Sequence, residues 1–284
     1  MEKQKVNELE RIANRGRILG LEAVNRCKSG HLGGAFSAMD LITVLYFHQM
    51  HIDPQNPKNP DRDRFVLSKG HCTAALYPLL AMRGYFPEEE LKMFRKAEGH
   101  MSGHVEMNYV RGVDMSTGSL GQGLSAAIGM ALGAKLDGKP YRVYAVMGDG
   151  EIEEGQIWEA AMAASKFRLD NLVGIVDVNG LQIDGTTAEI MPSAPLREKW
   201  AAFGWNVIEV DGHDMAAIAE ALSAAEQCKG VPTMLLAHTV KGKGVSFMEN
   251  QVGWHGHAPS DAEFELAMQE LQAKAKKLEG ECNG

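Results

Sequence analysis

The second half of the chain alternates between short apolar runs and segments in which apolar residues recur at helical spacing. The helical spacing covers Glu153–Phe167 and Met215–Gln227. The apolar runs have the length and composition of buried strands and are Arg142–Met147, Leu172–Asp177, Trp205–Val210 and Thr233–Thr239. Strands that alternate with helices predict a parallel sheet with crossover connections.

The first half of the chain is mainly helical by the same criterion. Apolar positions from Val6 to Val24 predict a first helix, and Asp53–Asp63 is a loop because it is rich in proline and asparagine. The other features are a glycine-rich link at Ser29–Gly34, a short apolar run at Arg64–Ser68, and predicted helices at Met39–His48, Tyr77–Met82 and Glu88–Lys96. We therefore expect residues 1–284 to form one doubly wound α/β domain, with a mostly parallel sheet, helices on both faces, and a charged C-terminal helix and tail over about residues 262–284.

Composition narrows the class of protein. The 29 Lys and Arg against 37 Asp and Glu give a formal net charge of −8, which argues against a nucleic-acid partner. Four scattered cysteines without a Cys-x-x-Cys pair indicate reduced thiols. The charged N-terminus does not resemble a signal peptide, and no apolar run reaches the roughly 18 residues of a membrane span, so we expect a cytoplasmic protein that is not bound to a membrane.

Polar residues follow two of the predicted strands, at the ends where α/β sheets bind ligands. Gly148, Asp149 and Gly150 end the first strand, and Asn179 ends the next. The two side chains could share Mg²⁺ or Ca²⁺, and the glycines would let a diphosphate approach the backbone beside the following helix. A Gly-Asp-Gly sequence alone is more often a simple turn, but the spacing to Asn179 favours the ligand-binding interpretation.

Five of the ten histidines lie beside glycine in polar loop segments. Such residues are often structural, yet several of them near one ligand-binding edge suggest a pocket that moves protons or binds a polyhydroxylated substrate. His213 is expected instead to cap the helix that begins near Asp214. The other four are His31, His71, His104 and His255. The lysines of Thr239–Gly244 either meet phosphate or are solvated, and the sequence leaves both possibilities open.

Other motifs carry less weight. Gly121–Ala126 fits a loose dinucleotide-binding pattern, but no strand precedes it, and no P-loop occurs. The His104–Glu106 segment resembles half of a zinc deaminase motif whose second half is missing. His100 and His104 have a spacing that could bind zinc, but the neighbouring glycines argue against a rigid helix, so a zinc site is the weaker hypothesis.

The order of these motifs resembles transketolase, a family of thiamine diphosphate enzymes. The matching stretches run in the family's order from about residue 10 to 260 and are SGHLGG, LSKGH, SGHVEMNYVRGVDMSTGSLGQGLSAAIGMALG, GDGEIEEGQIWEAAMAASKFRLDNL, VDVNGLQIDG, FGWNVIEVDGHD, and TVKGKG followed by WHG. The histidines together with GVDMSTGSLGQG resemble transketolase in particular. The chain departs from the family at Leu32, where proline is common, and at Val178, where Asp or Asn is common; since Asp177 and Asn179 are present, we expect the metal site to survive.

The resemblance implies a role for each matching residue. The metal ligands would be Asp149, Asn179 and the backbone carbonyl of Leu181, around Mg²⁺, for which Ca²⁺ or Mn²⁺ could substitute. The residues around thiamine diphosphate would be His71, Gly118, Ser119, Leu120, Gly148, Asp149, Gly150, Glu151, Asn179, Leu181 and His255. The catalytic residues would be His31, His71, His104 and His255, together with Glu154, which resembles the acidic residue that links the active-site carboxylates of paired subunits. In the family, the pair that resembles His31 and His255 moves protons at the substrate hydroxyl.

A full transketolase is longer than this chain, so the resemblance also implies a partner. The pyrimidine-binding domain, which supplies the glutamate that protonates the cofactor, has no counterpart here. We expect the diphosphate-binding subunit of a split transketolase, inactive alone and active in a heterotetramer with a C-terminal subunit, which transfers a two-carbon ketol unit between sugar phosphates. Two alternatives stay open: an α-type subunit of a 2-oxoacid dehydrogenase, and a non-catalytic thiamine diphosphate-binding protein.

Overall fold

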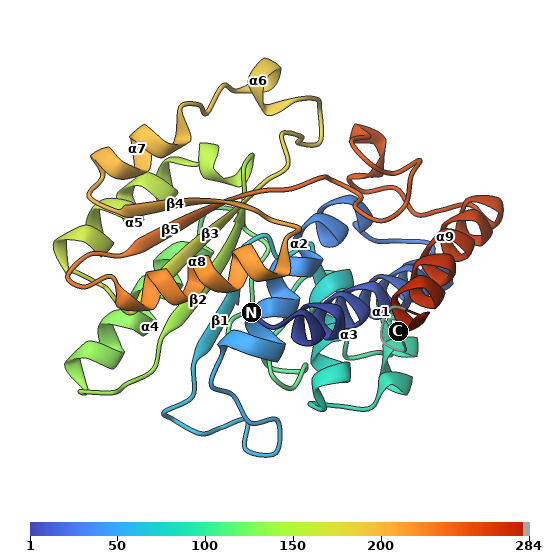
Figure 1. Ribbon diagram of the computed structural model, residues 1–284, viewed down its shortest axis with the longest axis horizontal. Helices are drawn as coiled ribbons and strands as arrows, with labels where there is room; N and C mark the ends of the chain where they lie inside the picture. Colours follow the sequence, from blue (N-terminus) through green and yellow to red (C-terminus); the bar gives the residue numbers. More distant parts are fainter. Residues whose placement is uncertain (281–284) are drawn as a thin grey trace.

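A parallel sheet organises the molecule (Figure 1). The computed structural model describes residues 1–280. In this part of the chain five strands lie in the order β1-β2-β3-β5-β4, and all neighbouring pairs are parallel. Their bounds are β1 Arg64–Leu67, β2 Val143–Gly148, β3 Leu172–Val178, β4 Asn206–Asp211 and β5 Thr233–His238. The four predicted strands are confirmed to within one residue at each end, and β1 forms on the short apolar run of the first half.

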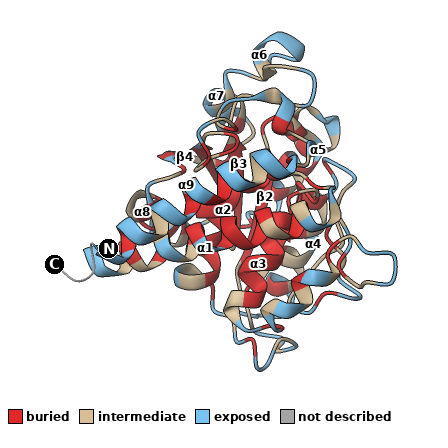
Figure 2. Ribbon diagram, turned by 90° about the vertical axis from the view of Figure 1, so that its right-hand side faces the viewer, coloured by how far each residue is buried: buried red, intermediate tan, exposed pale blue. Residues whose placement is uncertain are grey.

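Both faces of the sheet are covered, which is why the central strands β2, β3 and β5 are apolar along most of their length. Along β2, Val143 and Met147 pack in one apolar cluster, and Tyr144 and Val146 pack in another on the opposite face. Figure 2 shows that the strands and the helices packed beside them are largely buried. The predicted doubly wound sheet with helices on both faces is confirmed.

Two groups of helices pack on the two faces of the sheet. On the face of Val143 lie α4 (Gly123–Leu136), α5 (Gly155–Lys166) and α7 (Leu196–Ala202). On the other face α1 contacts α2, α3 and α9. The bounds of that group are α1 Lys3–Cys27, α2 Leu32–Val44, α3 Thr73–Arg83, α8 Met215–Gln227 and α9 Asp261–Gly280. The short helix α6 (Thr187–Ile190) projects at the top of Figure 1. Shorter helical turns cover Leu45–Gln49, Glu88–Met93, Glu151–Glu153 and Val252–Trp254.

The predicted glycine-rich link at Ser29–Gly34 contains the first turn of α2, which begins at Leu32. Glycine is required there by close packing. A Cβ added to Gly33 would lie 2.7 Å from the carbonyl oxygen of Trp254, a distance at which the two atoms clash. Packing against a distant segment thus outweighs the low helix propensity of glycine.

The segment predicted as an amphipathic helix at Glu88–Lys96 forms only a 3-10 turn over Glu88–Met93. Leu91 is its one buried residue, which is too little apolar contact to stabilise a longer helix. The predicted C-terminal helix is α9, and residues 281–284 of the predicted tail lie outside the described residues.

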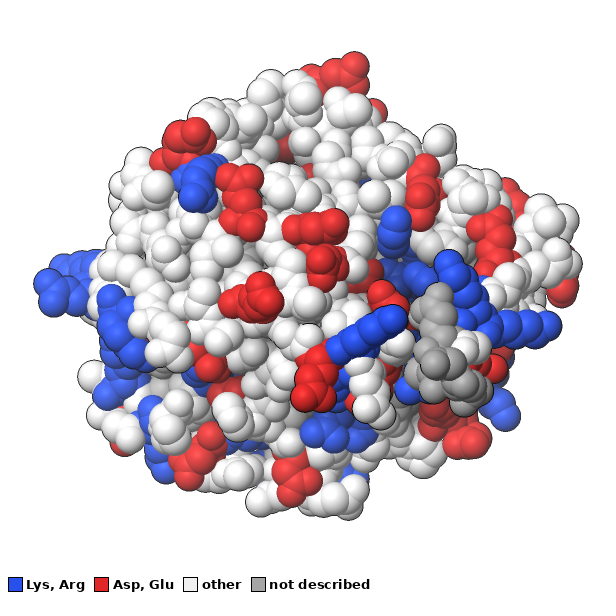
Figure 3. Space-filling view, viewed as in Figure 1, with Lys and Arg blue, Asp and Glu red and all other residues white. Residues whose placement is uncertain are grey.

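The surface of the described residues is charged with both signs. Acidic and basic side chains are interspersed on the face shown in Figure 3, in keeping with a net charge of −8. No helix between residues 1 and 280 combines the length and the apolar character needed to cross a membrane.

Candidate active site

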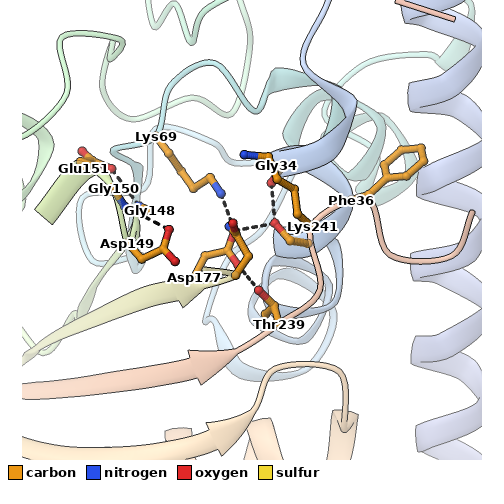
Figure 4. A network of polar contacts seen from close by, with 12 residues as sticks. Gly34, Phe36, Lys69, Gly148, Asp149, Gly150, Glu151, Asp177, Thr239 and Lys241 are labelled. Atoms are coloured by element: carbon orange, nitrogen blue, oxygen red, sulfur yellow. Dashed lines mark hydrogen bonds and ion pairs between the residues drawn. The ribbon is translucent and has the colours of Figure 1, made fainter. Parts of the chain in front are cut away.

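Three neighbouring strands end at one edge of the sheet. Because β2, β3 and β5 are adjacent and parallel, the segments that follow them lie together. Gly148 pairs with Asp177, and Val178 pairs with His238, so the three strand ends are level with one another. Figure 4 shows the side chains of Asp149 and Asp177 at this edge.

A cavity of about 340 Å³ opens at these strand ends. It is lined by nine predicted residues: His71, Leu120, Gly148, Asp149, Gly150, Glu151, Asn179, Leu181 and His255. The structure therefore brings the three predicted metal ligands into one space. Lys69 and Lys241 also line the cavity. Lys69 was not predicted as a site residue, although a lysine directly after a buried apolar run and before Gly-His is an unusual signal.

Asp149 is a buried carboxylate with 3% of its surface exposed. It accepts hydrogen bonds from the backbone N–H groups of Gly150 (3.0 Å) and Gly180 (2.5 Å). Burial and the nearby Asp177 carboxylate raise the pKa of Asp149 to about 6, since these hydrogen bonds and the Lys69 ammonium compensate only part of the desolvation. A divalent cation at this carboxylate would remove that penalty.

Asp177 joins the strand ends from within. Its carboxylate pairs with the Lys69 ammonium and accepts hydrogen bonds from the hydroxyl groups of Ser37 and Thr239. Nδ2 of Asn179 donates to the same carboxylate at 3.3 Å. Burial would raise the pKa of Asp177, but the Lys69 ammonium holds it below its usual value. Because these donors engage both oxygens of Asp177, its contribution is to orient Asn179.

The sequence left open whether the lysines of Thr239–Gly244 are solvated, and the structure shows that Lys241 is buried. It is 1% exposed, and its Nζ donates to the carbonyl oxygen of Leu181 (3.0 Å) and lies 2.9 Å from Nδ1 of His255. Burial and the charge of Lys69 lower the pKa of Lys241 to about 8. Lys243, the second lysine of the loop, is partly exposed, so only one of the two reaches the cavity.

Glu151 connects the predicted cofactor loop to the sheet. Its buried carboxylate accepts hydrogen bonds from the Ser68 hydroxyl and from the backbone N–H groups of Gly121 (3.1 Å) and Gly148 (3.0 Å). Burial raises the pKa of Glu151. These bonds hold the segment Gly118–Gly121 next to the end of β2.

The four predicted histidines form one cluster. The ring of His31 lies 5.2 Å from His71, 5.9 Å from His104 and 5.9 Å from His255, measured between centroids. His71 also stacks on His255 at 5.2 Å. Burial and the charge of Arg95 lower the pKa of His31 to about 4, and burial and the charge of Lys241 lower that of His255 to about 3. Burial lowers the pKa of His71 and His104 as well, so the cluster is neutral at pH 7 and each ring has one donor and one acceptor.

A second cavity of about 290 Å³ adjoins His104 and is also lined by Gly118 and Ser119. Gly118 has a φ of +147°, and a Cβ on it would lie 2.9 Å from Cδ2 of His104, so the loop requires glycine at this position. Glu154 is exposed at the N-terminus of α5. It thus lies at the surface and not within the histidine cluster.

The prediction that His213 caps α8 is wrong. Asp214, and not His213, accepts hydrogen bonds from the backbone N–H groups of Ala216 (2.9 Å) and Ala217 (3.0 Å). The short carboxylate reaches the first turn, as is usual at this position. His213 turns inward and contacts Asp40.

The weaker hypothesis of a zinc site has no support from the structure. Among residues 1–280, no group of three or more His, Cys, Asp or Glu side chains could hold a metal ion. His100 instead contacts Glu90, with 2.9 Å between Nε2 and a carboxylate oxygen. The predicted magnesium ligands are of another kind, one carboxylate, one amide and one backbone carbonyl, and such oxygen ligands suit Mg²⁺.

Comparison with known proteins identifies the family. The family described as "Transketolase, thiamine diphosphate binding domain" matches residues 9–279. The 6-deoxy-6-sulfo-D-fructose transketolase subunit SqwG of Clostridium sp. is 46% identical over 265 residues, which cover 93% of this chain and 96% of that protein. An apulose-4-phosphate transketolase subunit of Phocaeicola vulgatus is 44% identical over 277 residues, which cover 98% of each chain.

Longer relatives match over less than half of their own length. Human transketolase is 41% identical over 280 residues, covering 97% of this chain and 44% of the human protein. The structure of transketolase from Leishmania mexicana superposes with a TM-score of 0.84 at 32% identity, covering 96% of this chain and 46% of that one. The chain thus spans about half the length of these enzymes. The predicted family is confirmed, and these matches give no support to the alternative of a 2-oxoacid dehydrogenase subunit. The chain belongs to the transketolase family, in which it corresponds to the thiamine diphosphate-binding domain and, over nearly its whole length, to relatives that are separate transketolase subunits.

Proposed function

We propose that this chain is the cofactor-binding subunit of a two-subunit transketolase, which transfers a two-carbon ketol unit from a ketose phosphate to an aldose or its phosphate. The observation that carries the proposal is the cavity at the strand ends. A buried carboxylate, two buried lysines and neutral histidines face one space there. The lysines and a cation at the carboxylate would suit an anionic ligand. The histidines would suit a sugar whose hydroxyl groups they can contact.

The carboxylate end of the cavity fits a divalent cation and a diphosphate. Mg²⁺ would be held by Asp149, Asn179 and the carbonyl oxygen of Leu181, and it would relieve the desolvation that raises the pKa of Asp149. Lys69 and Lys241 bring positive charge to the same cavity. Gly150 lines the same cavity and has no side chain, so a diphosphate could approach its backbone closely.

The loop over Gly118–Leu120 would lie along the cofactor, with His71 and Glu151 beside it. When bound, thiamine diphosphate supplies a nucleophilic carbon for addition to a ketose carbonyl. The chain's own contribution is to place His31, His71, His104 and His255 around the reacting sugar. Since these rings are neutral at pH 7, they can hold the hydroxyl groups of the sugar through hydrogen bonds and accept a proton at a free ring nitrogen.

The rest of the active site would come from a second, C-terminal subunit. Leu120 and Ile183 line the cavity and are exposed large apolar side chains, and Ile190 and Met191 at the end of α6 are exposed as well. Exposed apolar groups of this size fit a surface that another chain covers. Two relatives of matching length are named as subunits, which supports the same arrangement. We infer a heterotetramer in the cytoplasm that acts on sugar phosphates, with Glu154 near the contact between subunits.

Reconstitution tests the proposed function. The chain is purified alone and together with a C-terminal transketolase subunit of the same organism. Ketol transfer from a ketose phosphate to an aldose phosphate is measured with and without Mg²⁺ and thiamine diphosphate. We expect turnover only in the complete mixture. Full turnover by the chain alone would refute its assignment to a two-subunit enzyme.

Two further outcomes separate the alternatives. Turnover of pyruvate without ketose turnover would identify a 2-oxoacid dehydrogenase subunit. Calorimetric binding of thiamine diphosphate to the complex without turnover of either substrate would identify a non-catalytic binding protein.

A further inference from the structure

A buried polar network ends at the residue before Lys241. It contains Arg17 from α1, Asp40 from α2, His213 from the loop after β4, and Val240 from the segment after β5. None of these four residues lines the cavity. The network therefore joins α1, α2 and the loop after β4 to the segment that carries Lys241, which Figure 4 shows leaving β5.

The network begins with a buried ion pair. Nη1 and Nη2 of Arg17 donate to the two carboxylate oxygens of Asp40 at 2.9 Å and 2.8 Å, and the side chains are 1% and 7% exposed. Nη2 also donates to the carbonyl oxygen of Phe36 at 2.9 Å. Burial would raise the pKa of Asp40, but the Arg17 guanidinium holds it well below its usual value. Asp40 is therefore an ionised acceptor at any physiological pH.

The hydrogen bonds define the proton position on His213. The backbone N–H of Val240 donates to Nε2 at 2.8 Å. Since a backbone N–H can only donate, Nε2 accepts, and the proton of the neutral ring lies on Nδ1. Nδ1 lies 2.7 Å from an oxygen of Asp40 and donates to it. Asp40 thus selects the tautomer that can accept from Val240, as carboxylates do for histidines that bind metals.

The backbone on the other side of Lys241 is also held. Gly242 donates its N–H to the carbonyl oxygen of Gly33 at 2.9 Å, and Asn250 donates to the carbonyl oxygen of Lys241 at 2.9 Å. The bond from His213 to Val240 completes this anchoring on the N-terminal side. The side chain of Lys241 has few alternatives once its backbone is held at these three points.

Such anchoring matters because the position of Lys241 is unfavourable without an anion. Its ammonium is buried, and it shares the cavity with the ammonium of Lys69. Burial of a lysine also costs the conformational entropy of its long side chain. A segment that was free to move would let Lys241 swing to solvent and would have to be ordered again whenever an anionic ligand binds.

We propose that Asp40 and His213 are positioning residues that hold the Lys241 ammonium in the cavity for an anionic ligand, through the backbone N–H of Val240. Neither residue contacts the ligand. The inference rests on the proposed function in one respect, which is that the anionic ligand is the diphosphate of thiamine diphosphate.

The first test does not depend on the cofactor. Amide hydrogen exchange is measured on the full chain alone. His213→Ala should speed exchange over residues 239–250 about tenfold or more, and His213→Gln should restore much of the protection, because its amide can both donate and accept. His238→Ala is the matched control, since His238 is exposed and lies two residues from Val240. Unchanged exchange in His213→Ala overturns the inference.

The second test is a double-mutant cycle in the reconstituted complex. His213→Ala should weaken the affinity for thiamine diphosphate about tenfold, while kcat at saturating cofactor stays within about twofold of the original. In a Lys241→Ala background the same change should weaken affinity less than twofold. Equal effects in both backgrounds overturn the inference, because His213 would then act without Lys241.

Two further provisions keep a failure of this inference distinguishable from misfolding and from a failure of the proposed function. If His213→Ala does not fold, His213→Leu replaces it, since leucine fills the space but makes neither hydrogen bond. If the unmodified complex does not bind thiamine diphosphate, the proposed function is wrong, and the exchange experiment still decides whether His213 holds the segment.

Discussion

Nζ of Lys241 lies 2.9 Å from Nδ1 of His255. An ammonium group can only donate, so Nδ1 accepts, and the neutral ring carries its proton on Nε2. The same ammonium donates to the carbonyl oxygen of Leu181, a predicted metal ligand. One lysine therefore connects the proposed metal site to the histidine cluster, and it disfavours protonation of His255.

Acidification is expected to destabilise the chain through His255. An unfolded histidine titrates near pH 6.5, whereas burial and Lys241 lower the pKa of His255 to about 3. As the pH falls below about 6.5, the unfolded state binds a proton that the folded state does not, so stability is lost. His255→Gln should make the loss between pH 7 and pH 4.5 about 1–2 kcal/mol smaller. Urea unfolding at both pH values measures it, with the exposed His238→Gln as control; equal losses in His255→Gln and the original chain would contradict the prediction.

Asp149→Asn is expected to separate ligand binding from stability. Removing this proposed metal ligand should weaken Mg²⁺-dependent binding of thiamine diphosphate by more than the roughly 10–100-fold loss that follows removal of a residue that only orients a metal ligand. The free chain should be at least as stable at pH 7, because a pKa raised to about 6 means that the Asp149 carboxylate costs more free energy in the fold than in the unfolded chain, and this cost is fully present above about pH 6. Calorimetry of the complex and thermal unfolding of the chain measure the two effects. Asp137→Asn, at an exposed residue, is the control, and a large fall in stability of Asp149→Asn would argue against the assigned electrostatics.

Lys69→Met should destabilise the chain strongly, by about 3–5 kcal/mol, because it leaves the Asp177 carboxylate buried without its partner. Lys5→Met removes a partly exposed ion pair with Glu8 and should cost less than about 1 kcal/mol. Chemical denaturation of both variants gives the comparison. Similar small losses in the two would show that Asp177 does not depend on Lys69.

Two glycine substitutions should have opposite signs. Gly118→Ala introduces a side chain at a φ of +147° and a Cβ at 2.9 Å from His104, so it should destabilise the loop by about 1 kcal/mol or more. Gly129→Ala lies on the exposed side of α4, where nothing lies within 4 Å of the added Cβ, and should stabilise by about 0.5–1 kcal/mol. Thermal unfolding of the two variants tests the pair, and stabilisation by Gly118→Ala would contradict the close approach to His104.

The site could be predicted where its residues follow predictable elements. Asp149 and Asn179 come directly after buried strands, and parallel strands end at one edge, so their proximity followed from local pattern alone. The error at His213 has a different cause. Its neighbour Asp214 can reach the first turn of α8, while Asp40, far away in sequence, draws His213 inward. A local motif does not reveal which of two adjacent polar residues has a distant buried partner.

The sequence by itself determined the parallel sheet, the strand-end position of the proposed metal ligands and the likeness to transketolase, because these depend on the spacing of residues along the chain. Only the tertiary structure decided that Lys69 and Lys241 are buried in the same cavity and that Asp177 pairs with one of them. A lysine in a glycine-rich loop has the same local sequence whether it is solvated or buried. Its environment is set by the segments that pack around it, and the free energy of burying a charge depends on the partners those segments bring.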